Sequence, residues 1–247
     1  MGSAVTLRFV GSGDAFGSGG RLQTCMLLEG AGAPLMIDCG ASSLIGLRRD
    51  RIDPHHIGHV VISHLHGDHF SGLAFLMLEC RIAGRTEPLV VAGPPGIEAR
   101  LATTTEALYP GSSSVPSRFE VTYREIEPGG TTTVGPAVVA AFEAEHRSGA
   151  PSLTLRIEYG DRIVVYSGDT AFTDRLLTAV DGADLFVCES SAYDRPIPFH
   201  MDWATLSANR DRLGCRRLVV THMGPEMLAR VADLAVESAS DGLVLTV

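Results

Sequence analysis

The chain has 247 residues, 45% of them hydrophobic, which is enough for one α/β domain with a substantial buried core. Its formal net charge is −9, from 20 Lys and Arg against 29 Asp and Glu. This charge is spread along the chain and repels phosphate backbones, which disfavours non-specific binding to long nucleic acid. A small anionic substrate remains compatible with the sequence if bound metal ions supply local positive charge.

Cysteine usage and the N-terminal stretch narrow the class further. The five cysteines are widely separated and form no CxxC pair, so we expect free, buried thiols, with neither a disulfide framework nor a cysteine zinc site. The start has no basic region followed by a long apolar run, and no segment reaches membrane-spanning length. We therefore expect a soluble, cytoplasmic protein with no membrane partner.

Short β-branched runs alternate with helical patterns along the chain. Strands are expected at 4–10, 34–38, 59–63, 88–93, 153–159, 162–169, 185–190, 217–223 and 243–247. Helices are expected at 70–83, 94–108, 170–181, 203–213 and 224–237. Asp202 precedes the fourth helix as a cap, and Pro225 stands in the first turn of the fifth. Strand-rich ends with helices between them predict two packed sheets covered by helices.

The middle of the chain, residues 118–146, alternates like antiparallel strands, with Gly129-Gly130 as their expected turn. The stretch GSSSVPS, residues 111–117, is linker-like, but it is too short to separate domains and is typical of a surface loop. The chain has no internal repeat. We therefore expect a single domain over residues 1–247.

Three histidines and an aspartate crowd into the motif HLHGDH, directly after an apolar run. In an extended chain His64 and His66 point the same way, and Gly67 permits a sharp turn that brings Asp68 and His69 to the same point. Neutral imidazoles with one carboxylate suit Zn²⁺ and also Mn²⁺ or Fe²⁺. The alternative, a set of hydrogen-bonded loop histidines, explains this demanding spacing less well.

Three more side chains of the metal-binding type each follow an expected strand: His146, Asp169 and His222. Taken singly, each has an alternative explanation. Asp169 would be the N-cap of a helix beginning near Ala171, and the two histidines would be ordinary loop residues. Together they repeat the strand-end position of the HLHGDH motif. We therefore expect them to complete a metal site.

HLHGDH, a later His, a GDT and a late THM resemble the metallo-β-lactamase fold hydrolases in their two-metal form. The resemblance covers nearly the whole chain and implies an α+β fold, a four-layer αββα sandwich with two divalent metal ions at one edge of the paired sheets. Zn²⁺ is the expected ion, with Mn²⁺ or Fe²⁺ as alternatives. The resemblance also implies two ligand groups: His64, His66 and His146 for the first metal, Asp68, His69 and His222 for the second, with Asp169 bridging both.

Within this superfamily the chain looks most like the ribonuclease Z-like branch. The motifs that carry this resemblance are the opening GSGDAFGSGGR, the DCG after PLMI, the SGDT and the histidine of PFHMDW. The spacing also resembles the cyclic phosphodiesterase of the carbon–phosphorus lyase pathway. The resemblance places Glu189 and His200 beside the metals. There His200, steadied by Glu189, would protonate the leaving alkoxide, while Asp68 would hold a metal-bridging hydroxide and take its proton. A simple loop histidine is the alternative for His200.

The glycine-rich GSGDAFGSGG superficially suggests a phosphate cradle. Its spacing is GxGxxxG, and strand character follows where a nucleotide-binding fold requires a helix, so we reject dinucleotide binding. The resemblance places this loop at the border of the metal pocket. Asp14 in this loop is expected to form a turn, with a pocket role as the alternative.

The resemblance favours hydrolysis of a small, possibly cyclic, phosphodiester. In ribonuclease Z an RNA-gripping arm is inserted between the positions of His146 and Asp169, where this chain has only 22 residues. Processing of transfer RNA is therefore not expected. A lactonase or other carboxylic-ester hydrolase is the leading alternative, and a metal-dependent sensor or scaffold without turnover is another.

Arg195 and Tyr193 are candidates for holding a phosphate or for a surface role. Members of this branch are often homodimers.

Overall fold

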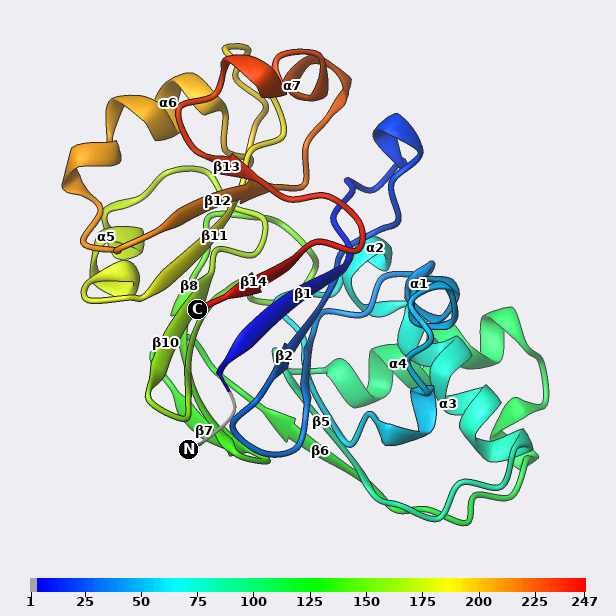
Figure 1. Ribbon diagram of the computed structural model, residues 1–247. Coiled ribbons are helices and arrows are strands. Elements are labelled where there is room, and N and C mark those ends of the chain that lie inside the picture. The colour runs from blue at the N-terminus through cyan, green and yellow to red at the C-terminus, as the bar shows by residue number, and fades with distance from the viewer. Residues whose placement is uncertain (1–3) are drawn as a thin grey trace.

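Two seven-stranded sheets form the centre of the computed structural model, which describes residues 4–247. The first sheet has the order β14-β1-β2-β3-β4-β5-β6, and Figure 1 shows it between the second sheet and helices α1 to α4. Its strands are β1 (Thr6–Gly11), β2 (Cys25–Glu29), β3 (Leu35–Ile37), β4 (His59–Val61), β5 (Leu89–Gly93), β6 (Val121–Glu125) and β14 (Val244–Thr246).

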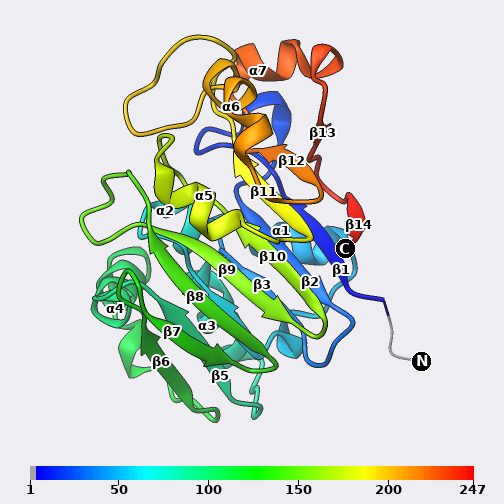
Figure 2. The same ribbon diagram turned by 90° about the vertical axis from the view of Figure 1, so that its left-hand side faces the viewer.

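The second sheet has the order β13-β12-β11-β10-β9-β8-β7 and faces the viewer in Figure 2. Its strands are β7 (Thr131–Val134), β8 (Ala137–Glu143), β9 (Leu153–Tyr159), β10 (Arg162–Tyr166), β11 (Leu185–Glu189), β12 (Leu218–Thr221) and β13 (Glu237–Ser238). Parallel pairing joins β10, β11, β12 and β13, whereas β7, β8, β9 and β10 pair antiparallel. The strands β8, β10, β11 and β12 therefore all run the same way and end at one edge.

Helices cover the outer face of each sheet. On the first sheet they are α1 (Ser43–Arg49), α2 (Gly67–Phe70), α3 (Gly72–Ile82) and α4 (Ile97–Leu108). On the second they are α5 (Asp174–Val180), α6 (Trp203–Ala208) and α7 (Pro225–Ala229). Asp202 caps α6 by accepting a hydrogen bond from the Thr205 backbone N–H at 2.8 Å, which confirms the predicted cap. No helix within the described residues is long and apolar enough to cross a bilayer.

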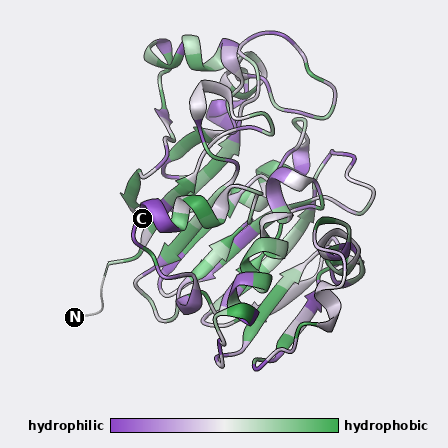
Figure 3. Ribbon diagram, turned by 90° about the vertical axis from the view of Figure 1, so that its right-hand side faces the viewer, coloured by the Kyte–Doolittle hydropathy of each residue, from purple (hydrophilic) through white to green (hydrophobic). Residues whose placement is uncertain are grey.

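Three apolar clusters hold the four layers together. The first lies between the two sheets and includes Leu7 and Tyr166. The second lies between the first sheet and α3 and includes Val60 and Leu73. The third lies between the second sheet and its helices and includes Phe186. Figure 3 shows hydrophobic residues on the strands and mixed faces on the covering helices, as expected when each helix buries one side only.

The middle of the chain differs from the sequence prediction. Gly129-Gly130 is not the turn of a hairpin, because β6 pairs parallel with β5 in the first sheet while β7 belongs to the second. The hairpin joins β7 to β8 instead, with Gly135 in a left-handed conformation at its turn (φ 58°). Alternation with a period of two identifies strands but not their partners. This stretch is therefore the crossover between the two sheets.

Four expected helices are shorter than predicted, including that at 94–108, where α4 begins only at Ile97, and one helix was not predicted at all. The helix expected at 224–237 is wrong beyond α7, because a 3₁₀ turn (Val231–Asp233) and the strand β13 follow it. The helix expected at 203–213 ends with α6, before a 3₁₀ turn (Arg210–Arg212), and that expected at 170–181 starts at Asp174. Helix α1 is too short for its period to be recognised. All five cysteines are free and four are buried, as expected.

Candidate metal centre

The HLHGDH motif lies directly beyond the C-terminal end of β4. His64 is fully buried, and His66 has an extended backbone and forms the N-cap of α2. The helix begins at Gly67, earlier than the expected start at residue 70, so that Asp68 and His69 lie in its single turn. An extended pair followed at once by a helical turn brings the four side chains to one edge of the first sheet.

The second sheet presents three side chains at its facing edge. His146 follows β8, Asp169 follows β10 and His222 follows β12, three strands that end at the same edge. A left-handed Gly168 (φ 60°) turns the chain before Asp169, and a Cβ there would lie 2.6 Å from the Leu153 carbonyl oxygen. Only glycine fits this close approach. Asp169 is not a helix cap, because Thr173 is the N-cap of α5.

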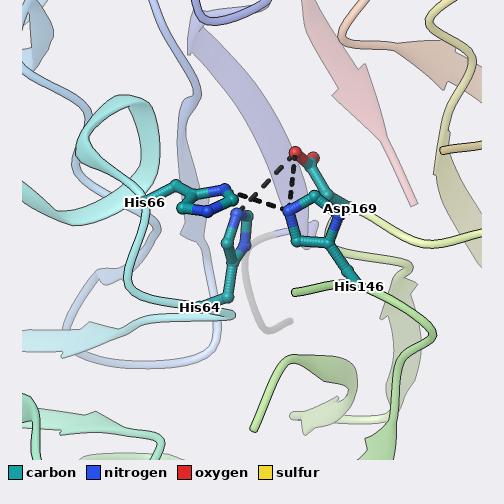
Figure 4. Close-up of side chains that lie close together, drawn as sticks. All are labelled: His64, His66, His146 and Asp169. Atoms are coloured by element: carbon teal, nitrogen blue, oxygen red, sulfur yellow. Dashed lines mark hydrogen bonds and ion pairs between the residues drawn. The ribbon is translucent and has the colours of Figure 1, made fainter. Parts of the chain in front are cut away.

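A first group comprises His64, His66, His146 and Asp169, whose ligand atoms all lie within 4.8 Å of one another (Figure 4). His146 Nε2 lies 3.0 Å from His66 Nδ1, and His64 Nε2 lies 3.7 Å from Asp169 Oδ2. Within residues 4–247, the buried His64 Nε2 has no hydrogen-bond partner. A buried polar atom of this kind is costly unless something else binds it.

A second group comprises Asp68, His69, His222 and again Asp169, also within 4.8 Å. Asp68 Oδ2 lies 3.2 Å from both His69 Nε2 and His222 Nε2, and the two Nε2 atoms lie 3.4 Å apart. Asp169 Oδ1 lies 3.3 Å from His69 Nε2, while its Oδ2 faces the first group. The two oxygens of Asp169 therefore face different groups, as a bridging carboxylate requires.

The electrostatics of these groups fit divalent cations. Burial lowers the pKa of His64 well below its usual range, so its imidazole is neutral. Burial alone would raise the pKa of Asp169, but the neighbouring histidines, His222 foremost, hold it well below its usual range. Burial opposes protonation of His222 too, but Asp169 and Asp68 raise its pKa to about 9. Ionised carboxylates with converging ring nitrogens match the donor set of Zn²⁺, Mn²⁺ or Fe²⁺.

A buried carboxylate that the sequence did not reveal as functional supports this cluster. Asp38 Oδ2 lies 2.7 Å from His69 Nδ1, and Asp38 also accepts hydrogen bonds from the Ser63 backbone N–H at 2.7 Å and from Ser63 Oγ at 2.8 Å. Ser63 Oγ in turn lies 3.1 Å from His64 Nδ1. These contacts fix the ring orientation and leave Nε2 of both histidines directed at the cluster. The sequence signal that could have identified Asp38 is the DCG motif, of which it is the first residue.

His146 is oriented by the backbone of the opposite loop. Its Nδ1 lies 3.0 Å from the Phe199 carbonyl oxygen, which leaves Nε2 for the cluster. Phe199 has a left-handed backbone (φ 67°), unusual for a non-glycine residue, and it directly precedes His200. The loop that positions His146 therefore also presents His200.

Glu189 and His200 form a hydrogen-bonded pair beside the cluster. Glu189 is fully buried at the end of β11, and its Oε2 lies 3.0 Å from His200 Nδ1. Glu189 also accepts hydrogen bonds from Ser191 Oγ at 2.6 Å and from the Thr170 backbone N–H at 2.5 Å. Burial would lower the pKa of His200, but its hydrogen bond to Glu189 and that charge raise it overall. Only 3.8 Å separates His200 Nδ1 from Asp169 Oδ2.

A cavity of about 410 Å³ opens over the cluster. Its lining includes His66, Asp68, Asp169, His200 and His222 from the groups above, and Asp14, Phe16, Arg195 and Ile197 from the surrounding loops. Asp14 accepts hydrogen bonds from the backbone N–H groups of Phe16 and Ser18, at 3.2 and 2.9 Å, which confirms the predicted turn. Tyr193 instead lies against Arg230, whose guanidinium is 4.4 Å from its ring centroid.

Comparisons with known proteins agree with this geometry. The profile of the Beta-lactamase superfamily domain matches residues 35–223, about three quarters of the chain. The chain belongs to the β-lactamase superfamily. It is 30% identical to a ribonuclease Z of Ignicoccus hospitalis, across 92% of this chain and 90% of the relative. A ribonuclease Z of Lachnoclostridium phytofermentans is 26% identical, with 84% of each chain covered.

Solved structures of other proteins share the fold of this chain. The short form of human tRNase Z superposes with a TM-score of 0.80 at 23% identity, covering 97% of this chain and 98% of the other. A diphosphatase from the PhnP family superposes with a TM-score of 0.75 at 17% identity, covering 99% and 98%. The predicted α+β sandwich and the resemblance to the ribonuclease Z-like branch are confirmed.

This chain is therefore a hydrolase of the metallo-β-lactamase fold, and this fold implies divalent metal ions. The structure brings together all seven side chains that the resemblance nominated as ligands, and it places Glu189 and His200 beside them. Their roles as ligands and catalytic groups stay predictions.

Proposed function

We propose that this hydrolase is a phosphodiesterase that uses two divalent metal ions to cleave a small phosphodiester, cyclic esters included. The observation that carries the proposal is the Glu189–His200 pair beside the seven-residue cluster. A phosphodiester with an alkoxide leaving group needs a proton donor close to the reacting phosphorus. An ester or lactone carbonyl makes no such demand in the attack step.

The roles of the side chains follow from their hydrogen bonds. Two divalent ions at this cluster would supply Lewis acidity and a water activated at neutral pH. In the proposed reaction, the Asp68 carboxylate accepts the proton of the attacking water. Glu189 holds the proton of His200 Nδ1, so the proton given to the departing oxygen comes from His200 Nε2. Asp169 keeps the two ligand groups at a fixed separation through its two oxygens.

Three features support a small substrate. The residues between His146 and Asp169 form a short loop, then β9, β10 and their connecting turn, with no additional arm. The net charge of −9 disfavours a long phosphate backbone. The cavity of about 410 Å³ lies within the range that holds small ligands. The similarity to ribonuclease Z makes an RNA substrate the alternative that the test must include.

A substrate panel tests the proposal on protein loaded with Zn²⁺ or Mn²⁺. The panel contains bis(p-nitrophenyl) phosphate, 2′,3′-cyclic nucleotides, a transfer RNA precursor with a 3′ extension, and a γ-lactone. We expect turnover of the first two. Efficient cleavage of the precursor, or lactone opening without phosphodiester cleavage, would show that the proposal is wrong.

A further inference from the structure

The side chain of Phe16 is 94% exposed, although it lines the cavity over the metal centre. An ordered turn presents it. Asp14 accepts hydrogen bonds from the backbone N–H groups of Phe16 and Ser18 and from Ser18 Oγ, the last at 2.6 Å. Gln23 Nε2 donates to the Ala15 carbonyl oxygen at 2.9 Å. These hydrogen bonds fix the backbone around Phe16, while its ring stays open to a ligand. Exposing an apolar ring to water is unfavourable, and no contact within the protein offsets this cost.

The turn that bears Phe16 is also anchored to the second half of the molecule. It continues into a 3₁₀ turn (Ser18–Gly20) that lies beside α7, as Figure 1 shows near the top. A Cβ at Gly19 would come within 2.9 Å of Leu228 Cδ1, so the backbone packs closely there. Phe16 thus belongs to a supported wall of the cavity rather than to a loose loop.

Arg195 lines the same cavity, and its charge is unused. It is exposed and has no ion pair or hydrogen bond with any residue in the described range 4–247. The neighbouring Arg230 differs, because its guanidinium lies 3.8 Å from Asp194 and stacks on Tyr193. Asp14, Asp68 and Asp169 also line the cavity, and Arg195 is the only arginine among the described residues that line it. A free guanidinium there suits an anionic group of the substrate.

We propose that Phe16 and Arg195 recognise the part of the substrate that is not cleaved, and that this part is a nucleotide. Its base stacks on the Phe16 ring, and a second phosphate group pairs with Arg195. The inference rests on the proposed phosphodiesterase function, because a cyclic or esterified nucleotide combines a phosphodiester with a planar aromatic base. Every base has a π-face, so one exposed ring accepts different bases with comparable strength.

Two chromogenic esters with the same leaving group isolate the contribution of the base. Thymidine 5′-(p-nitrophenyl phosphate) carries a base and methyl p-nitrophenyl phosphate does not. We expect Phe16→Ala to raise KM for the thymidine ester about tenfold with kcat unchanged, and to leave the methyl ester unaffected. Phe16→Tyr should retain the wild-type KM. Ile82→Ala is the matched control, because Ile82 is 74% exposed and lies outside the cavity.

Isothermal titration calorimetry on the metal-loaded protein gives a readout independent of turnover. Thymidine 3′,5′-bisphosphate should bind about tenfold more tightly than thymidine 5′-monophosphate, and Arg195→Ala should abolish this difference. Phe16→Ala should weaken both nucleotides equally. Arg100→Ala, which removes an exposed arginine of α4, is the control.

The outcomes separate the two proposals. If the wild type cleaves neither ester, the phosphodiesterase proposal fails, and the nucleotide titrations still decide the inference. If Phe16→Ala raises KM for both esters equally, the ring holds the nitrophenyl group, and the base assignment is overturned. If neither variant changes any KM or any nucleotide affinity, nucleotide recognition by these residues is overturned while phosphodiesterase activity stands.

Discussion

The two sheets contribute to the candidate site in opposite ways. The first sheet supplies four of the seven predicted ligands from one six-residue stretch after β4. The second sheet supplies His146, Asp169 and His222 from the ends of three different strands, and Glu189 from a fourth. The first contribution depends on local backbone geometry, and the second on strand pairing between residues far apart in the chain.

The two sheets also differ in how firmly their side chains are held in place, and so in which part of the site is preformed. On the first sheet, Asp38 and Ser63 fix the histidine rings through buried hydrogen bonds. On the second sheet, the loop that ends in His200 is more open, and His146 is oriented by a carbonyl group of that loop. The two contributions meet at Asp169. Substitutions should therefore have different effects according to the sheet they touch.

Asp169→Ala should have the largest effect, because it removes the carboxylate shared by both ligand groups. We expect metal content to fall from about two ions per chain to less than one and phosphodiesterase activity to fall to background. Elemental analysis and turnover of bis(p-nitrophenyl) phosphate measure this. Asp174→Ala, an exposed carboxylate at the start of α5, is the control. Two ions retained in Asp169→Ala would contradict the bridging role.

His200→Ala should lower the turnover of 2′,3′-cyclic nucleotides by roughly 10²- to 10⁴-fold, because the poor leaving group loses its acid. The effect should be much smaller on bis(p-nitrophenyl) phosphate, whose leaving group needs no proton. Metal content should stay at the wild-type level, and His56→Ala, on the far surface turn Pro54–His56, serves as the control. Equal losses on both substrates would remove the case for a general acid, and an unchanged lactone activity would favour the ester-hydrolase alternative.

Asp38→Asn should weaken metal binding by about 10- to 100-fold, because the amide no longer stabilises His69 in the required orientation. Asn tolerates the left-handed backbone that Asp38 adopts (φ 56°), so the fold should persist. Competition with a chromophoric chelator measures the affinity, and circular dichroism checks the fold. Wild-type affinity would show that the first-sheet ligands do not depend on this support.

Asp202→Ala should have the smallest effect, since it removes only the cap of α6. We expect a loss of about 1 kcal/mol in the free energy of unfolding, which corresponds to roughly 2–4 °C in Tm for a chain of this size. Metal content should be unchanged. A large loss of cyclic-nucleotide turnover would show instead that α6 controls the position of His200.

Much of the fold was predictable because strands and long helices have their own sequence periods. The parallel strands β10 to β12 are short, mainly apolar and largely buried runs, and α3 and α4 have clear helical patterns. The exceptions share a cause. Strand partners elsewhere in the chain decide whether residues 121–134 form a hairpin or a crossover. Such partners also decide whether residue 237 ends a helix or pairs with β12.

The sequence by itself predicted a metal-binding chemistry and the convergence of the contiguous HLHGDH stretch, because that motif converges through local backbone geometry alone. It also nominated His146, Asp169, His222, Glu189 and His200, through a resemblance. Only the tertiary structure decided that these side chains meet, that Asp38 holds His69, and that Phe16 and Arg195 face the same cavity. Such contacts arise from strand order and loop packing, which join residues as far apart in the chain as Phe16 and Arg195, and no local pattern encodes such partners.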